Sequence, residues 1–299
     1  MTLLPIVDAH MHMWDYENHK YPWLQGTYRE FWFGDYRKLR KNYLLANYLA
    51  DVRSQNVVKC VHLQAQWDHS DPIGETTWLQ GIADEHGYPH GIIGFCDFRQ
   101  DDADQVLAAH AEYRNVRGIR QDINWHPDPF YRFCEDKDLM TDPKWLRNFA
   151  LLEKYGFSFD LQIYAGHQGE DAYQLVKNHP NIQFLLDHSG SPEDKSPEGK
   201  QRWRSALSKL AELPNVAAKL SGFDMHDHNW TLQSLREPIM DVIERFGSSR
   251  CLFASNFPVS SLYGSYDHLV SAHREILADL SADEQRAVLH DNAVRLYRL

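Results

Sequence analysis

Apolar and polar positions along the chain fall into short hydrophobic runs that are separated by longer stretches with helical spacing. Such runs are typical of buried parallel strands, and the stretches between them are typical of crossover helices. Eight strands alternating with helices predict an α/β fold, a single (β/α)8 TIM barrel over residues 1–299, with an open doubly wound sheet as the alternative. The predicted strands are Ile6–His10, Val57–Gln64, Gly91–Asp97, Val116–Arg120, Ser158–Gln162, Gln183–Asp187, Val216–Leu220 and Arg250–Ala254.

Amphipathic spacing between these runs predicts the helices. A capping-box pattern at Ser281–Glu284 predicts a further helix that continues to Leu299. Chain breakers such as Gly156 and Pro214 stand shortly before predicted strands, as the barrel requires. The predicted crossover helices are Leu45–Val52, Thr76–Asp84, Ala103–Tyr113, Asp142–Tyr155, Ala172–His179, Arg202–Leu213, Pro238–Phe246 and Asp267–Leu280.

Two segments depart from the minimal strand–helix repeat. Residues 13–40 are rich in aromatic side chains and have little periodicity, so we expect a long loop after the first strand that packs on the barrel mouth. Trp14, at its start, is expected to form a wall of the pocket. Residues 122–141 form a second irregular loop, which contains His126.

The first predicted strand carries two histidines near its end. Successive side chains of a strand point to opposite faces, so Asp8, His10 and His12 are expected to share one face and Ala9 and Met11 the other. Two adjacent imidazoles suit a metal ion or a grip on one small substrate. The alternative is a pair of surface histidines close to the N-terminus.

Polar side chains gather where the predicted strands end, which is the end of a barrel that carries its active site. Strand 5 alternates strictly, which predicts polar groups inside the barrel and aromatic groups under the helices. Arg120 is expected either to pair with a barrel acid such as Asp160 or to hold an acidic substrate, and Lys219 to form a structural ion pair. Gln64 is expected to bind substrate or, like Gln66, to satisfy backbone groups. The polar residues at these ends are His62, Gln64, Arg120, Asp122, Gln162, Tyr164, Asp187, His188, Ser221, Asp224, His226, Asp227, His228, Ser255 and Asn256.

The overall composition of the chain limits the classes of partner that it can bind. The net charge of −11 argues against nucleic acid or an anionic membrane as a partner, so we expect a small-molecule substrate; the oligomeric state is left open. No run approaches the length of a membrane span, and no secretory signal is evident. Four scattered cysteines fit buried thiols in the cytoplasm. Serine-hydrolase, zincin and nucleotide-binding motifs are absent from the sequence.

Three motifs together resemble the amidohydrolase superfamily. They are Asp-Ala-His-x-His-x-Trp from Asp8, Leu-Asp-His-Ser-Gly from Leu186 and Ser-Asn-Phe-Pro from Ser255. The chain is most similar to the lactonase-like, amidohydrolase-2 branch of predicted TIM-barrel metal-dependent hydrolases, which includes pyrone-dicarboxylate and sugar-acid lactonases. The likeness extends to the terminal Asp291-Asn292-Ala293. It implies a hydrolase that opens carboxylic esters of small acidic or sugar lactones.

The resemblance also implies site residues. It places His10, His12 and His188 at the reaction centre, with Arg120, Gln162, Tyr164 and His228 as candidates for substrate contacts. Members of this branch differ in whether they need a metal. The sequence therefore leaves two centres open: a metal-independent one, and one in which His10, His12 and His188 bind a divalent cation, zinc above all.

One position departs from the family pattern. The family usually carries an aspartate base at the end of strand 8, where this chain has Asn256. An amide can position a water molecule but cannot deprotonate it. Candidates to take the proton lie on neighbouring loops: Asp122, Asp224, His226, Asp227 and His228.

We therefore expect a cytoplasmic lactonase-type hydrolase with His10, His12, His188 and Asn256 in catalytic roles. In this hypothesis the histidines polarise the ester carbonyl and Asn256 holds the water. The alternatives are a metal-dependent hydrolase or decarboxylase on the same centre, and a weakly active or non-catalytic binder of small molecules.

Overall fold

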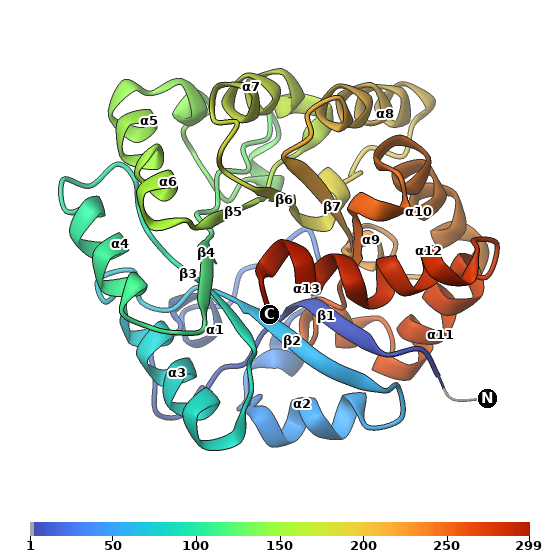
Figure 1. Ribbon diagram of the computed structural model, residues 1–299, viewed down its shortest axis with the longest axis horizontal. Coiled ribbons are helices and arrows are strands. Elements are labelled where there is room, and N and C mark those ends of the chain that lie inside the picture. The colour runs from blue at the N-terminus through green and yellow to red at the C-terminus, as the bar shows by residue number, and fades with distance from the viewer. Residues whose placement is uncertain (1–2) are drawn as a thin grey trace.

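Eight parallel strands follow one another in chain order around a ring in the computed structural model, which describes residues 3–299 (Figure 1). A parallel bridge between Met11 and Phe257 joins the first strand to the segment after the last, so the ring is nearly closed. The predicted (β/α)8 barrel is confirmed. The strands are β1 (Ile6–Met11), β2 (Val57–Leu63), β3 (Gly91–Gly94), β4 (Val116–Ile119), β5 (Ser158–Leu161), β6 (Phe184–Leu186), β7 (Val216–Leu220) and β8 (Cys251–Phe253).

Helices surround the ring of strands. Most match the predicted segments, but the segment predicted as Asp142–Tyr155 is two helices, because the α-helical hydrogen bonding is interrupted at Ala150. They are α1 (Pro22–Gln25), α2 (Leu45–Val52), α3 (Gly74–His86), α4 (Ala103–Ala111), α5 (Pro143–Phe149), α6 (Leu151–Tyr155), α7 (Ala165–Asn178), α8 (Pro197–Ala211), α9 (Phe223–His226), α10 (Leu232–Phe246), α11 (Tyr266–Leu277), α12 (Ala282–Arg286) and α13 (Asn292–Tyr297).

The helix predicted from Pro238 begins earlier. Thr231 caps α10 by accepting a hydrogen bond from the backbone of Ser234, and the helix continues through Pro238. The predicted tail helix is not one regular α-helix, since a π-helical turn at Ala287–Asp291 joins α12 to α13. Its irregular hydrogen bonding leaves no trace in the hydrophobic spacing, so the pattern could not reveal it.

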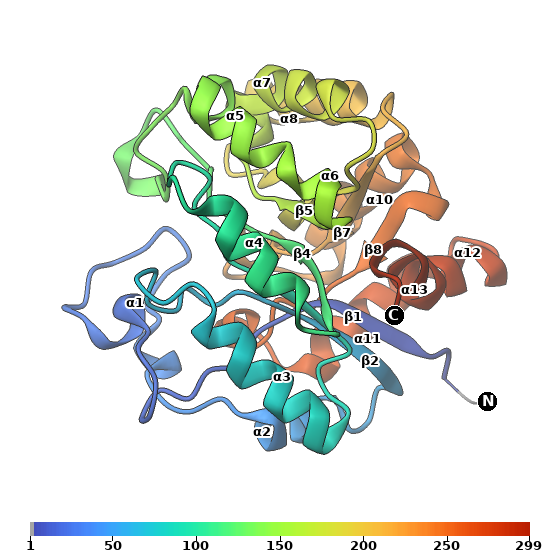
Figure 2. The same ribbon diagram turned by 60° about the vertical axis from the view of Figure 1, so that its left-hand side comes forward.

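The C-terminal helix closes one end of the barrel. Ala293, Leu296 and Tyr297 pack in the same apolar cluster as the inward-facing strand residues Val7 and Ala9. Figure 2 shows α12, α13 and the C-terminus on one side of the molecule and the loop with α1 on the other. The barrel therefore has a sealed floor and a mouth covered by loops.

Strand β5 follows the predicted alternation. Asp160 points into the barrel, where it pairs with Lys219 and accepts a hydrogen bond from the Tyr297 hydroxyl at 2.6 Å. Phe159 points outward and packs with Phe98 and Phe149 under the helices. An alternating strand with one polar face thus places a charged pair inside the barrel.

Strand β1 does not follow its predicted alternation. The pairing register with β2 shifts between Asp8 and Met11, so the side chain of Asp8 leaves the face of the histidines. Its carboxylate accepts hydrogen bonds from Tyr48 of α2 at 3.2 Å and Tyr266 of α11 at 3.1 Å. The prediction that Asp8 shares a face with His10 and His12 is wrong, because an extra residue in one strand reverses the order of faces.

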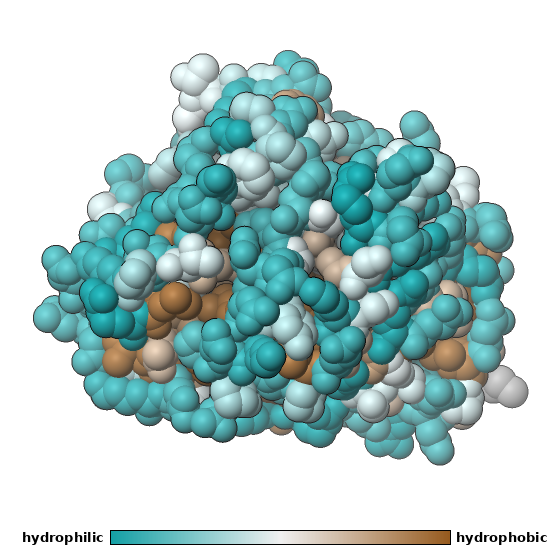
Figure 3. Space-filling view, turned by 90° about the horizontal axis from the view of Figure 1, so that it is seen from above, coloured by the Kyte–Doolittle hydropathy of each residue, from teal (hydrophilic) through white to brown (hydrophobic). Residues whose placement is uncertain are grey.

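The surface agrees with the composition. The face shown in Figure 3 is predominantly hydrophilic, with apolar residues in small separate areas. Within residues 3–299, no helix has the length and apolar character needed to cross a bilayer. The four cysteines are buried free thiols, as expected.

Candidate active site

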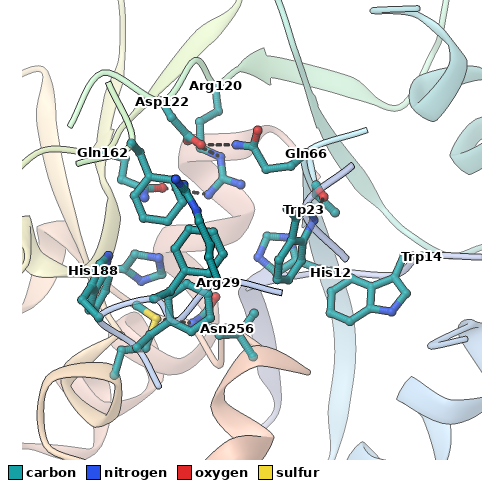
Figure 4. A pocket seen from close by; sticks show the side chains of 17 residues that line it. His12, Trp14, Trp23, Arg29, Gln66, Arg120, Asp122, Gln162, His188 and Asn256 are labelled. Atoms are coloured by element: carbon teal, nitrogen blue, oxygen red, sulfur yellow. Dashed lines mark hydrogen bonds and ion pairs between the residues drawn. The ribbon is translucent and has the colours of Figure 1, made fainter. Parts of the chain in front are cut away.

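A cavity of about 270 Å³ lies at the barrel mouth, at the C-terminal ends of the strands. Aromatic side chains of the loop after β1 form much of its wall, as the sequence led us to expect (Figure 4). Its floor carries polar groups from several strands. The lining residues are His12, Trp14, Trp23, Arg29, Phe31, Trp32, Phe33, Ala65, Gln66, Arg120, Asp122, Phe133, Gln162, His188, Met225, Asn256 and Val259.

His10 and His12 are in direct contact, with their Nε2 atoms 3.2 Å apart. The Nδ1 atom of His12 lies 2.8 Å from the carbonyl oxygen of Leu63, which requires a proton on Nδ1 and leaves a lone pair on Nε2. The Nδ1 atom of His10 faces the carboxylate of Asp187 at 3.4 Å. If both Nδ1 atoms carry the protons, two lone pairs face each other, so this pair needs a proton or a cation between its Nε2 atoms.

His188 stands beside this pair, with its ring centroid 4.6 Å from that of His10. Its Nδ1 is 3.0 Å from the Ser221 hydroxyl, so Nε2 is the nitrogen available for chemistry. Burial lowers the pKa of His188 to about 4, which keeps the imidazole neutral at pH 7. The structure therefore brings all three predicted imidazoles together.

The turn that carries His188 is tightly constrained. His188 and Ser189 both have left-handed backbone conformations, with φ of 50° and 51°. Gly222 after β7 lies against this turn, and a Cβ at that position would be 2.6 Å from the Cβ of His188. Glycine at 222 is therefore what allows the imidazole to pack so closely against the end of β7.

A buried network of charges lies beneath the imidazoles. The Lys219 ammonium is 2.8 Å from Asp187 and also pairs with Asp160, as the expected structural ion pair. Burial opposes ionisation of Asp187, but Lys219 and His10 outweigh it and hold the pKa of this carboxyl well below its usual range. Asp187 thus presents a negative charge to the Nδ1 side of His10. Asp187 is part of the Leu-Asp-His-Ser-Gly motif, but its sequence context indicates no role for it.

Arg120 reaches the cavity from the end of β4. Its guanidinium donates to the Gln162 side chain at 3.0 Å and to the Gln64 carbonyl, and lies 3.5 Å from Asp187. The expected pairing of Arg120 with a barrel acid is made with Asp187 rather than with Asp160, whose carboxylate pairs with Lys219. Arg120 is therefore fixed in position by its hydrogen bonds, and its guanidinium presents a positive charge to the cavity.

Asp122 is the carboxylate among the cavity residues. Its side chain accepts a hydrogen bond from Gln66 and lies 3.7 Å from Arg120, and burial raises its pKa. Four other candidates for the missing base do not line the cavity: Asp224, His226, Asp227 and His228. Asp227 pairs instead with Lys195 at 3.4 Å.

Asn256 lies at the predicted position after β8. Its backbone N–H donates to the His10 carbonyl at 2.7 Å, which ties this turn to β1. Its side-chain Nδ2 lies 3.2 Å from the sulfur of Met225, and its φ of 58° is left-handed. The amide lines the same cavity as His12 and His188 (Figure 4).

Several predicted substrate contacts lie away from the cavity. Tyr164 is buried and donates to the Tyr131 carbonyl at 2.7 Å, and His228 stacks on Tyr263 with ring centroids 4.1 Å apart. The Gln64 side chain accepts from the backbone N–H of Gln66, which matches its expected backbone role. Trp14 and Gln162 do line the cavity.

Arg29 is the main cavity residue that sequence reasoning missed. Its guanidinium stacks on the ring of Phe31 at 4.5 Å, inside the aromatic loop. The loop has no periodicity that could place one of its side chains over the barrel. The loop contains five lysine and arginine residues, and nothing in the sequence marks Arg29 as the one that reaches the cavity.

The sequence also left open whether the three histidines bind a divalent cation. The 3.2 Å between the Nε2 atoms of His10 and His12 is near the ~3.3 Å separation of two nitrogens on a tetrahedral zinc ion. Within residues 3–299, however, no third ligand atom joins this pair within 4.8 Å of both. The pair fits two positions of a metal site, but His188 stands too far away to complete a compact three-histidine centre.

A family model described as Amidohydrolase matches residues 7–299. The chain belongs to the amidohydrolase family. Among curated relatives of this amidohydrolase, an uncharacterized protein y4mH of Sinorhizobium fredii is 42% identical over 299 residues, all of both chains. An L-fucono-1,5-lactonase of Burkholderia multivorans is 27% identical over 98% of this chain and 96% of its own length.

A solved structure agrees with this assignment. An amidohydrolase from Burkholderia multivorans with bound zinc superposes on this amidohydrolase with a TM-score of 0.83 and 26% identity, and the match covers 99% of each chain. The protein is thus a member of a hydrolase family, with the fold and the motifs of that family along its whole length.

Proposed function

We propose that this amidohydrolase opens a small lactone that carries a carboxylate or hydroxyl groups, by hydrolysis of the ring ester. The observation that carries the proposal is the cavity in which two buried neutral imidazoles, an amide and a guanidinium converge. The Burkholderia multivorans relative named as an L-fucono-1,5-lactonase supports this reaction class.

In this proposal His188 is the proton acceptor. Asn256 holds the attacking water by hydrogen bonding, and the water oxygen attacks the acyl carbon as its proton moves to Nε2 of His188. The ring C–O bond then breaks, and the proton passes from His188 to the departing alkoxide. The product is the open hydroxy acid.

Arg120 takes the role first expected of the histidines. A neutral His12 with its proton on Nδ1 has no hydrogen to donate from Nε2, so it cannot polarise a carbonyl from that nitrogen. Arg120 carries guanidinium donors at the cavity, and donors aimed at developing negative charge stabilise the oxyanion. In this proposal the guanidinium of Arg120 donates hydrogen bonds to the carbonyl oxygen of the substrate.

The charges of the cavity favour an acidic substrate. Two guanidinium groups, those of Arg29 and Arg120, line it against the single carboxylate of Asp122. Arg29 has no carboxylate partner within the described residues, so its charge is available to a substrate carboxylate. The aromatic wall would pack against the faces of the ring.

The test is a hydrolysis screen with a pH indicator, on sugar-acid lactones and carboxylated aromatic lactones. We expect turnover of at least one carboxylated lactone, and loss of that turnover in Arg29→Met for the acid but not for a neutral analogue. Failure of the wild-type protein on the whole panel, with binding retained, would instead identify a non-catalytic binder.

A metal-dependent hydrolase is the second candidate, because the Nε2 atoms of His10 and His12 lie 3.2 Å apart, a separation that suits two ligands of one cation. A cation held by His10 and His12 would act as a Lewis acid and lower the pKa of a bound water. The relative with bound zinc supports this candidate. Elemental analysis of protein purified without chelator distinguishes the two: activity that survives chelation with no bound metal excludes the second.

A further inference from the structure

A second group of ligand-type side chains lies outside the cavity, where two loops of the barrel mouth meet the start of α7. His126 comes from the loop after β4, His167 from the first turn of α7, and Glu193 from the loop before α8. One donor atom from each lies within 4.8 Å of the other two, and this is the one such group of three in residues 3–299. Residues far apart in sequence thus converge on one point.

The distances within the group suit a small cation. The Nε2 atoms of His167 and His126 lie 3.1 Å and 3.5 Å from the same carboxylate oxygen of Glu193. Two ligands at about 2.0–2.2 Å from a tetrahedral zinc ion are separated by about 3.3 Å. We propose that His126, His167 and Glu193 bind a divalent transition-metal ion, zinc by ligand type, with water as the fourth ligand.

The charge balance of the group points the same way. Within the described residues, the ion-pair partners of Glu193 are these two histidines, with no lysine or arginine. The neighbouring carboxylate of Asp194 is already paired with Arg202. Because the Glu193 side chain is only 6% exposed, its negative charge is poorly solvated, and a cation would compensate it.

The protein also holds the ligands in place. The buried side chain of Gln168 donates to the Ile123 carbonyl and accepts from the backbone of Trp125 and Tyr164, so it ties the loop of His126 to the start of α7. A preformed arrangement of this kind favours binding, because little further ordering is required.

Asp128 sets the tautomer of His126. The backbone N–H of Asp128 donates to Nδ1 of His126 at 3.0 Å, and the Asp128 carbonyl oxygen lies 3.3 Å from the same nitrogen. The N–H contact places the imidazole proton on Nε2, which faces Glu193. Zinc binding at Nε2 would move this proton to Nδ1, where it would donate to the carbonyl, which is an outer-shell contact common in zinc sites. His167 is 22% exposed, so solvent can reach the site.

A bound ion would connect to the cavity wall. Phe133, on the same loop as His126, lines the cavity, and Tyr131 of that loop contacts both the His126 and Tyr164 rings. The ion would therefore brace the loop that forms one side of the cavity, while taking no part in the reaction itself.

The test is calorimetric titration of the chelator-treated, full-length protein with zinc chloride. We expect His167→Ala and Glu193→Gln each to lose about one equivalent of zinc relative to the wild type. The exposed residues His86 and Glu85 offer matched controls, His86→Ala and Glu85→Gln, which should bind as the wild type. His12→Asn should retain this equivalent, which separates the site from any ion at the cavity.

A second readout is thermal unfolding. Zinc should raise the melting temperature of the wild type and of His12→Asn, and the rise should be absent in His167→Ala and Glu193→Gln. The proposal is overturned if those two variants bind the same number of zinc equivalents as the wild type. It is equally overturned if the wild type binds no zinc, since the group is then a hydrogen-bonded triad only.

Discussion

Lys219 places its ammonium nitrogen 2.8 Å from a carboxylate oxygen of Asp187, at a depth where neither side chain has any exposed surface. The same nitrogen pairs with Asp160, so one cation serves two buried carboxylates. Through Asp187 this network faces Nδ1 of His10. The orientation of the imidazole pair therefore depends on a charge in the barrel interior.

Removal of that cation should strongly destabilise the fold. Lys219→Met leaves Asp160 and Asp187 buried without compensation, and breaking a buried pair in this way costs about 3–5 kcal/mol. Urea unfolding measures the loss. Lys209→Met, which removes an exposed pair with Glu170, is the control and should cost far less, because solvent screens that pair. Equal costs for the two variants would contradict the role of the network.

Loss of the proposed proton acceptor should reduce turnover while leaving substrate binding nearly intact. We expect His188→Asn to lower kcat about 10²–10⁴-fold with little change in KM, because the acceptor acts on the water. The exposed His86→Asn is the matched control. Steady-state kinetics on the lactone identified by the screen gives the result.

The pH profile provides an independent check on His188. Burial lowers the pKa of His188 to about 4, and only the neutral imidazole accepts a proton. In the free wild-type enzyme kcat/KM should therefore stay level from about pH 5 to pH 8 and fall as the pH drops through about 4. An acid limb that survives unchanged in His188→Asn would assign the titration to another group.

A carboxylate at position 256 should partly replace His188. Asn256→Asp supplies a proton acceptor at the place where the amide holds the water, so in the His188→Asn background it should restore about tenfold or more of the lost rate. The double variant is compared with each single one. Further loss of activity instead of a gain would show that the Asn256 amide acts as a hydrogen-bond donor.

Glu75 should make stability depend on pH. Burial raises its pKa from 4.5 to about 8, so between these values the folded state retains a proton that the unfolded chain has released. Its contribution to stability is therefore lost as the pH rises through this window. Glu75→Gln keeps the oxygen that accepts from the Ala65 N–H and removes the titration.

We thus expect Glu75→Gln to gain stability over the wild type by up to a few kcal/mol between pH 5 and pH 8. Denaturant unfolding at several pH values measures the difference. The exposed Glu85→Gln is the control. A difference that does not change with pH would mean that Glu75 is already ionised in the folded protein.

The regular spacing of side chains along strands explains which features the sequence could predict. Hydrophobic runs located all eight strands, and the rule that strand ends share one rim brought His10, His12 and His188 together. The alternation of β5 placed Asp160 inside the barrel and Phe159 outside it. These features depend only on the two-residue period of a strand.

Features set by irregular backbone could not be predicted in this way. The register shift in β1 moved Asp8 to the helix layer, and nothing in its composition marks the extra residue. Tyr164 lies beyond the end of β5, at the start of α7, where the strand alternation no longer sets the direction of its side chain. Arg29 lies on a loop without a period, so its distance from the cavity depends on how that loop folds over the mouth. The spacing of hydrophobic and polar residues along the sequence does not indicate how an irregular loop folds.

The position of Tyr297 has a consequence for biosynthesis. Its hydroxyl donates a hydrogen bond to Asp160, yet Tyr297 follows all eight strands along the chain. While the ribosome is still translating the helices before it, the barrel lacks its floor, and the Lys219–Asp160 pair is open to water from below. The nascent chain should therefore reach protease resistance only after residues 292–297 have left the exit tunnel.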